Sequence, residues 1–306
     1  MKPKSIPQSV FVDKKNLLKL KQKAQYFSIH QNKLLADIGF GDSVSPFKTK
    51  GLDFQEVRVY QPGDDIRFID WKITAKHNKP YTKLYTDEKE RQIFLIVDMR
   101  STMKFATQGV FKSVMAAKMA TLLSFLAENK NDKIGFTILG DEELETSLSG
   151  VGSQNLLLLV DKLEKYGKLS DETEQKSTFL KALSQSEKAI RRGSMVFIIS
   201  DFSDFDEETA VIIKRLSNKS VCSLIHTYDI LEKEFPKGIF PITDGETFSY
   251  IDVKSDALQK KYQEDFSKRM EALSTLAKKE NVGYLPLKTT DDFLKNLIVY
   301  CKGGLI

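Results

Sequence analysis

Two short, fully apolar runs that each end in an acidic loop stand out in the pattern of hydrophobic and polar positions. Residues 93–97 are apolar throughout and lead into the loop at 98–103, and residues 195–199 lead in the same way into the loop at 200–204. Such runs are typical of strands buried on both faces of a parallel sheet. Because open α/β sheets bind ligands at the carboxyl ends of their strands, the two acidic loops predict one shared site.

Helical and strand patterns alternate through the rest of this region. The predicted helices span residues 109–129, 156–166, 178–190, 207–216, 255–280 and 291–300, and the further strands span 134–139, 221–225, 247–253 and 282–285. Pro236 and Pro241 mark an expected loop. Alternation of this kind predicts an α/β domain over residues 91–306, with a doubly wound, mostly parallel sheet.

Residues 1–90 follow a different pattern and predict a small α+β module. A helix is expected from an N-cap at Asp13 to about Asp37, with an apolar stripe on one side and lysines opposite. It either lies on the body of the protein or offers its polar face to a partner, and we favour the first. Two alternating strands, at 54–60 and 81–85, follow.

A charged turn beside the single tryptophan joins these two strands. Its conspicuous residues are Gly63, Asp64, Asp65, Arg67, Asp70 and Trp71. In a structural interpretation, Arg67 forks between carboxylates, Asp64 or Asp65 caps a short helical turn, and Trp71 fills the join between the module and the next domain. The alternative makes the carboxylates a catalytic or metal site. We favour the structural interpretation.

Composition limits the classes of function. The net charge of +5 arises from 18 Lys/Arg against 11 Asp/Glu through Gln92, leaving 29 against 31 afterwards. The lysines are scattered and not interleaved with aromatics, so no nucleic-acid partner is predicted. No apolar run approaches the ~20 residues that a membrane helix needs, and the N-terminus lacks a signal-peptide pattern. With two cysteines in apolar surroundings, which we interpret as reduced, we expect a cytoplasmic location.

Asp98, Thr102, Thr178 and Asp201 could supply hard oxygen ligands for Mg²⁺. Their arrangement resembles the metal-ion-dependent adhesion site of the von Willebrand factor A domain, which has an Asp-x-Ser-x-Ser loop, a later Thr and an Asp after the fourth strand. In that family the bound ion leaves one position open for an acidic group of a partner protein. The resemblance implies a partner-binding site and a Rossmann-like sheet of von Willebrand factor A type.

Arg100 departs from this pattern, because it stands where the first Ser of the motif belongs. A positive charge ~4 Å from Mg²⁺ would be repelled by ~8 kcal/mol at an effective dielectric constant of about 20. Either Arg100 swings away, or it takes the place of the ion and pairs with Asp98 and Asp201. We favour the second, which predicts a degenerate site that binds partners, or holds itself together, without metal. Asp98 and Asp201 could also simply cap the ends of their strands.

A longer resemblance covers the chain from about Leu34. Residues 51–54, 58–67 and 69–75, with the string Pro-Gly-Asp-Asp-x-Arg-x-x-Asp-Trp, look like the signature of the domain-of-unknown-function 58 family, and residues 201–204 and 242–247 match it too. The resemblance implies a von Willebrand A-like domain after this signature. It also implies association with MoxR-type AAA+ ATPases, as adaptors in chaperone-like maturation or stress responses. Many relatives carry membrane helices, so this chain resembles the short, soluble form.

The hypothesis is therefore a non-enzymatic adaptor with a MoxR-type AAA+ ATPase and its client as partners, and with no cofactor unless Mg²⁺ binds the degenerate site. One alternative is a metal-dependent hydrolase or nuclease that uses the aspartates of the turn together with Asp98 and Asp201. The sequence shows no catalytic His, no phosphate-binding Gly loop and no nucleophile–base pair in its support. The other alternative is a purely structural subunit.

Overall fold

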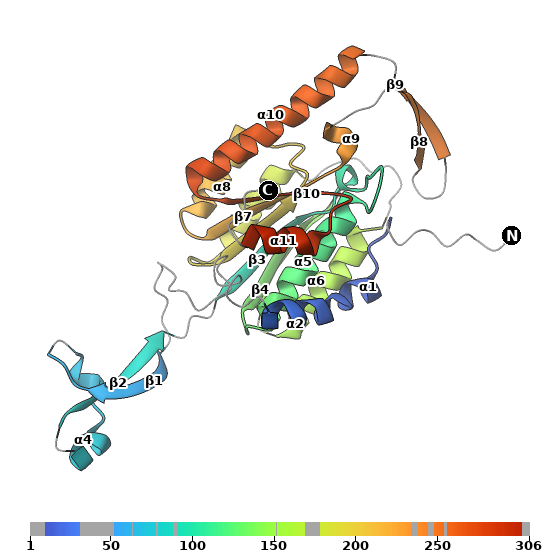
Figure 1. Ribbon diagram of the computed structural model, residues 1–306. Coiled ribbons are helices and arrows are strands. Elements are labelled where there is room, and N and C mark those ends of the chain that lie inside the picture. Colours follow the sequence, from blue (N-terminus) through green and yellow to red (C-terminus); the bar gives the residue numbers. More distant parts are fainter. Residues whose placement is uncertain are drawn as a thin grey trace. The chain divides into compact units, whose positions relative to one another are not determined.

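The computed structural model describes residues 10–30, 52–62, 64–77, 79–87, 91–150, 152–168, 178–233, 238–243, 248–253 and 256–301 (Figure 1). The chain divides into two compact units. The smaller comprises residues 45–91, and the larger comprises the residues on either side of it.

The larger unit is built on a six-stranded sheet. In spatial order the strands are β10 (Gly283–Lys288), β7 (Val221–Tyr228), β6 (Met195–Ser200), β3 (Gln92–Asp98), β4 (Lys133–Leu139) and β5 (Leu144–Gly150). Neighbouring strands are parallel, except that β5 runs antiparallel to β4. The α/β class and the mostly parallel sheet are thus confirmed.

Helices pack on both faces of this sheet (Figure 1). One face carries α1 (Lys14–Leu18), α2 (Leu20–His30), α5 (Lys112–Glu128), α6 (Ser153–Tyr166) and α11 (Phe293–Cys301). The other carries α7 (Phe179–Ala189), α8 (Glu207–Ser217) and α10 (Asp256–Glu280). Alternate side chains of β3 enter the two cores: Ile93, Leu95 and Val97 lie in one, and Phe94 and Ile96 in the other. This is why the run is apolar at every position.

The N-terminal helical segment belongs to the larger unit. Asp13 accepts hydrogen bonds from the backbone N–H groups of Lys15 and Asn16, so the predicted N-cap is confirmed. Leu17, Leu20 and Ala24 are buried in the same core as α5. The expected module of residues 1–90 is corrected accordingly to 45–91, because the apolar stripe of the helix finds its partner on the larger unit.

The smaller unit contains an antiparallel pair of strands, β1 (Leu52–Val59) and β2 (Tyr81–Asp87). Between them lie a 3₁₀ turn, η2 (Ile66–Phe68), and a helix, α4 (Trp71–His77). Each begins at an aspartate: the Asp65 carboxylate accepts from the Arg67 N–H, and the Asp70 carboxylate accepts from the N–H groups at the start of α4. The predicted strand pair and helical turn are both present.

The structure contains two strands, β5 and β8, that the sequence did not predict. β5 is a half-exposed edge strand whose hydrophobic pattern is weak. β8 (Gly238–Thr243) falls where Pro241 suggested a loop, yet it pairs with β9 (Phe248–Val253) in a separate two-stranded ribbon. Proline is tolerated there because each strand of a two-stranded ribbon has a free edge. Among the described helices, none is long and apolar enough to cross a membrane.

Candidate functional site

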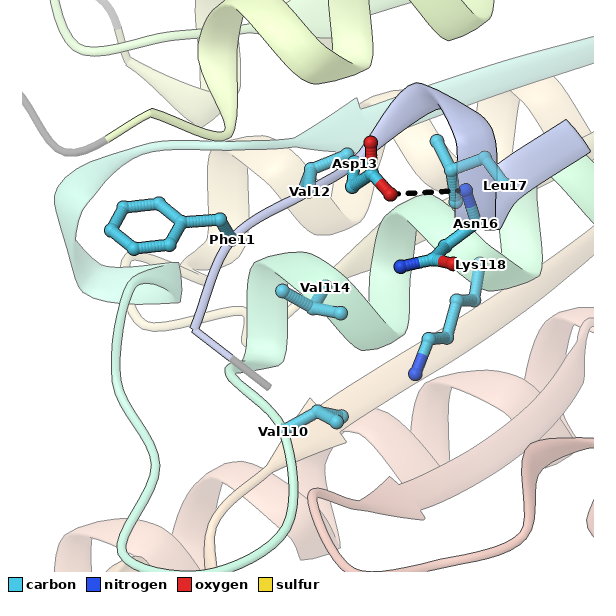
Figure 2. A pocket seen from close by; sticks show the side chains of 8 residues that line it. All are labelled: Phe11, Val12, Asp13, Asn16, Leu17, Val110, Val114 and Lys118. Atoms are coloured by element: carbon cyan, nitrogen blue, oxygen red, sulfur yellow. Dashed lines mark hydrogen bonds between the residues drawn. The ribbon is translucent and has the colours of Figure 1, made fainter. Parts of the chain in front are cut away.

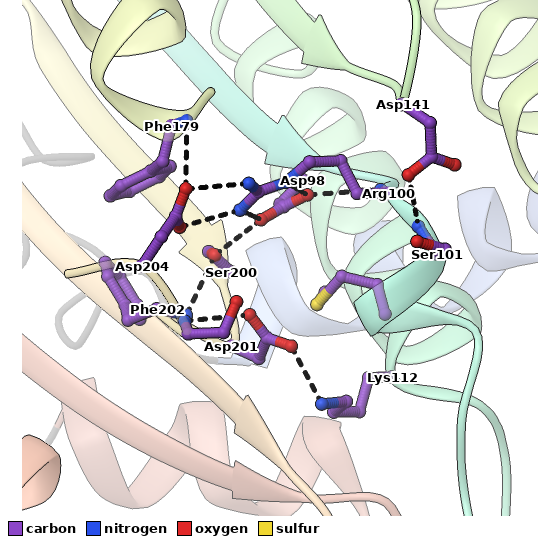
Figure 3. A network of polar contacts seen from close by, with 12 residues as sticks. Asp98, Arg100, Ser101, Lys112, Asp141, Phe179, Ser200, Asp201, Phe202 and Asp204 are labelled. Carbon is purple, nitrogen blue, oxygen red and sulfur yellow. Dashed lines mark hydrogen bonds and ion pairs between the residues drawn. The ribbon is translucent and has the colours of Figure 1, made fainter. Parts of the chain in front are cut away.

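Asp98 and Arg100 form the centre of the site at the carboxyl ends of β3 and β6 (Figure 3). The Arg100 guanidinium forks onto Asp98, with Nε 3.0 Å from Oδ1 and Nη2 2.7 Å from Oδ2. Strand register explains a further contact. Val97 pairs with Ile199, so the residues that follow them lie side by side, and the Ser200 hydroxyl donates to Asp98 Oδ2 at 2.8 Å. Asp98 and Arg100 are both 1% exposed.

Arg100 also bridges to the loop after β6, through Asp204. Its Nη1 lies 2.8 Å from Asp204 Oδ2, and its Nη2 lies 2.9 Å from Asp204 Oδ1. The expectation that Arg100 pairs with Asp98 is confirmed, whereas the second partner is Asp204 and not the expected Asp201. The reason lies in the loop, because Asp201 points toward a different cation (Figure 3).

That second cation is Lys112, in the first turn of α5. Its Nζ lies 2.8 Å from Asp201 Oδ2 and 2.5 Å from Oε1 of Glu232, on the short helix α9 (Ile230–Lys233). Lys112 is buried, as is Asp201. Sequence reasoning missed Lys112, Glu232 and the role of Asp204. For Lys112 no local signal exists, since it is a single lysine at the start of an apolar helix and its partners are remote in the chain.

Backbone hydrogen bonds fix the loops around these ion pairs. Phe202 adopts a left-handed conformation, with φ at 51°, and its N–H donates to the Ser200 hydroxyl. The Ser203 N–H donates to Asp201, and the Phe179 N–H at the start of α7 donates to Asp204. The loops after β3 and β6 and the start of α7 are therefore held as one polar network.

Burial and the ion pairs set the protonation of these groups. Burial raises the pKa of Asp98, while the hydrogen bonds and charge of Arg100 act against that rise. For Asp201 burial also raises the pKa, but the adjacent Lys112 ammonium outweighs it and lowers the value to about 2. Burial alone would lower the pKa of Arg100, yet its hydrogen bonds to Asp204 and Asp98 raise it above the ordinary range. Asp201 and Lys112 are therefore both charged at neutral pH.

The two threonines expected at the site have different surroundings. Thr178 is exposed and caps α7, its hydroxyl accepting from the Lys181 N–H at 3.3 Å. The Thr102 hydroxyl is buried and has no hydrogen-bond partner among the described residues. Among the described residues, neither hydroxyl is hydrogen-bonded to Asp98, Arg100 or Asp204.

The donor set does not fit a divalent cation. Both oxygens of Asp98 are bound by Arg100, and Asp201 is bound by Lys112, so an ion would have to displace a buried guanidinium and stand close to a buried ammonium. In the part of the chain that the structure describes, no group of three or more His, Cys, Asp or Glu side chains is placed to hold a metal.

The charged turn of the smaller unit divides into separate contacts. Asp64 binds Arg58 at 2.7 Å, and Asp65 binds Arg67 at 2.6 Å, so Arg67 does not fork between two carboxylates as expected. Asp70 pairs with Lys83 at 3.3 Å in addition to capping α4.

The other two residues singled out in that turn remain without a confirmed role. Trp71 is 70% exposed on its own unit, and its expected contact with the larger unit stays a prediction. Gly63 lies outside the described residues.

Comparison with known proteins gives a family match and several distant relatives. The family described as "Protein of unknown function DUF58" matches residues 56–272, more than half of the chain. "Uncharacterized protein Rv1480" of Mycobacterium tuberculosis (strain ATCC 25618 / H37Rv) is 29% identical over 115 residues, which is 38% of this chain and 36% of that protein. "Uncharacterized protein YeaD" of Bacillus subtilis (strain 168) is 27% identical over 112 residues, which is 35% of this chain and 28% of that protein. The chain thus spans about a third of the length of the curated relatives it matches.

Solved structures with some similarity include the conserved hypothetical protein BatB from Bacteroides thetaiotaomicron. It is 12% identical, with a TM-score of 0.42, and the match covers 70% of this chain and 98% of that one. An aerotolerance-related membrane protein from Bacteroides fragilis NCTC 9343 is 12% identical with a TM-score of 0.37, over 70% of this chain and 99% of that one.

Proposed function

The chain belongs to the family described as "Protein of unknown function DUF58", and on this premise we propose that it is a non-enzymatic adaptor. In this proposal it binds partner proteins at the carboxyl ends of β3 and β6, through a von Willebrand A-type domain whose adhesion site has lost its metal. The strand order and the pair of acidic loops support that domain type.

The observation that carries the proposal is the pairing of the buried carboxylates with resident cations. A hydrolase or nuclease needs a carboxylate that is free to bind a metal or to move a proton. Asp98 is instead bound by Arg100, and Asp201 by Lys112, with both pairs almost fully buried. These buried ion pairs are suited to fixing the conformation of the loops after β3 and β6. An adaptor needs such fixed loops because they form its binding surface.

The surface offered to a partner consists of the exposed residues around this core. Ser101, Thr178 and Ser203 are exposed, and Asp204 is 39% exposed at its side chain. The first turn of α8 adds Glu207 and Glu208, both exposed. The rim is therefore polar and acidic, which suits a partner surface that carries basic groups and hydrogen-bond donors. The buried Asp98, Arg100 and Asp201 shape this rim from beneath.

The partner we propose is a MoxR-type AAA+ ATPase, with the adaptor and its client acting in chaperone-like maturation or stress responses in the cytoplasm. This part rests on the resemblance of the Pro-Gly-Asp-Asp-x-Arg-x-x-Asp-Trp signature and not on the geometry of the site. Neither a cofactor nor nucleic acid has a role in this proposal.

The test is direct binding between the purified chain and the purified MoxR-type ATPase of the same organism, measured by biolayer interferometry. The double variant Glu207→Lys with Glu208→Lys reverses the charge of the rim without touching the buried pairs. We expect its affinity to fall at least tenfold. Glu271→Lys is the matched control, because Glu271 is exposed on α10 and has no ion pair among the described residues.

Two outcomes would overturn the proposal. One is equal affinity of the rim variant and wild type, with both folded by circular dichroism. The other is Mg²⁺-dependent hydrolysis of a phosphoester by the wild type that disappears in Asp98→Asn, since this would make the site catalytic.

A further inference from the structure

A pocket lies between the N-terminal strap, residues 10–17, and the first half of α5 (Figure 2). Its volume is about 220 Å³. The lining residues are Phe11, Val12, Asp13, Asn16, Leu17, Val110, Val114 and Lys118. The pocket lies in the larger unit and shares no lining residue with the site at the strand ends.

The strap is held in place by contacts outside the pocket. A Cβ atom on Gly167 would lie 2.4 Å from Val12 Cγ2, so the strap packs directly on the end of α6. The Lys14 N–H donates to Glu164 Oε1 at 2.9 Å. Asp13 directs its carboxylate to the backbone at the start of α1 and not into the space beside α5 (Figure 2). The pocket is therefore preformed, with its one carboxylate already bound.

Two hydrogen-bond donors in the pocket lack acceptors. Lys118 is half-buried, its side chain runs along the pocket toward Val110, and it has no hydrogen bond or ion pair among the described residues (Figure 2). The Asn16 side chain accepts from Lys19 through Oδ1, which leaves its amide N–H₂ free to donate into the pocket. Burial, together with the nearby charge of Lys23, lowers the pKa of Lys118. A half-buried cation without a counter-charge favours the binding of an anion.

The remaining walls are apolar and limit the size of the ligand. Phe11, Val110, Val114 and Leu17 contribute hydrocarbon surface. An engineered protein cavity of about 150 Å³ holds a benzene molecule, so this pocket has room for roughly nine non-hydrogen atoms. A ligand of that size with one charged end and one apolar end satisfies both kinds of wall.

We propose that this pocket binds a small monocarboxylate, with its carboxylate at Lys118 and the Asn16 amide and its apolar body against Val110 and Val114. The ligand class is set by the single unpaired ammonium, the single free amide and the short apolar walls. This site is separate from the adaptor surface, and its occupancy does not depend on the proposed function.

Benzoate fits the estimated size and is the probe, with benzamide as its neutral analogue of the same shape. Binding is measured on the full chain by a millimolar titration, followed by NMR of labelled valine methyl groups. We expect benzoate to shift the methyl signals of Val12, Val110 and Val114, and benzamide to bind about tenfold more weakly, because it loses a charge-assisted hydrogen bond.

Two lysine variants locate the charge that benzoate recognises. In Lys118→Met the affinity for benzoate should fall about tenfold while that for benzamide stays the same. Lys23→Met is the control, because Lys23 is exposed and does not line the pocket, and it should change benzoate binding by no more than about twofold. The proposal is overturned if benzoate moves none of these methyl signals, if benzamide binds as tightly as benzoate, or if Lys118→Met binds benzoate as well as wild type does.

Discussion

Replacing Arg100 by methionine should expose the energetic role of the buried pair. The substitution keeps much of the side-chain volume but removes the guanidinium and its four hydrogen bonds, two to Asp98 and two to Asp204. Among the described residues, this leaves the buried Asp98 with only the Ser200 hydroxyl and a backbone N–H as donors. Removing one partner of a buried pair costs about 3–5 kcal/mol, because the other charge loses its compensation. We expect the lower end, about 3 kcal/mol, since Asp98 can escape part of the penalty by binding a proton.

Arg215→Met is a control of matched geometry. Arg215 forks onto Glu187 in the same unit, with Nε 3.0 Å from Oε1 and Nη2 2.8 Å from Oε2, but Arg215 is 53% exposed. Solvent screens such a pair, so its loss should not change stability measurably. Urea unfolding of both variants should be followed by far-UV circular dichroism. The single tryptophan is not used as the probe, because Trp71 belongs to the smaller unit, which contributes no strand to the six-stranded sheet.

A rescue substitution separates the loss of charge compensation from a general packing defect. Asp98→Asn in the Arg100→Met background removes the uncompensated charge and should recover part of the lost stability. Comparable small losses for Arg100→Met and Arg215→Met would refute the reasoning, since burial would then make no difference. An Asp98→Asn substitution that deepens the loss would refute it as well.

Two further predictions concern Asp201 and the strap. The folded-state pKa of Asp201 is lowered from 3.8 to about 2, so its contribution to stability, about 2 kcal/mol, is present above pH 4 and is lost as the pH falls toward 2. In Lys112→Met this acid-dependent loss of stability should become smaller. The measurement is the free energy of unfolding as a function of pH between 2 and 5. An unchanged pH profile would contradict the conclusion that Lys112 lowers the pKa of Asp201. Gly167→Ala places a Cβ against Val12 and should cost about 1–3 kcal/mol in urea unfolding, whereas unchanged stability would mean that the strap is not packed as described.

The sheet could be predicted from sequence because its two central strands contain continuous apolar runs, residues 93–97 in β3 and 195–199 in β6. β3 and β6 are buried on both faces, which explains why their apolar runs are continuous, and runs this short favour strands over helices. β5 is an edge strand with half-exposed residues, so its sequence carries little of that pattern. The boundary of the N-terminal module was misplaced because the sequence of an amphipathic helix shows which face is buried but does not identify the element that covers this face.

The site was predicted in part, and the limit has a physical cause. Asp98 and Arg100 are two residues apart, so their pairing follows from local geometry. The pairing of Arg100 with Asp204 and of Asp201 with Lys112 depends on the conformation of the loops that follow β3 and β6. In particular, the left-handed turn at Phe202 turns Asp201 toward Lys112 and leaves Asp204 to meet Arg100. A non-glycine residue in that conformation is not signalled by residue type.

The two buried cations are better explained by loop geometry than by stability. A buried ion pair is weak evidence for stability, because apolar side chains of similar volume often serve as well. Apolar side chains would not, however, join one segment to another with directional bonds. Arg100 connects the loop after β3 to Asp204, which in turn receives the first N–H of α7, so one guanidinium positions three segments that are far apart in the chain. A bound metal could join such segments only while it is present, whereas the arginine is a covalent part of the chain and keeps them joined in every molecule.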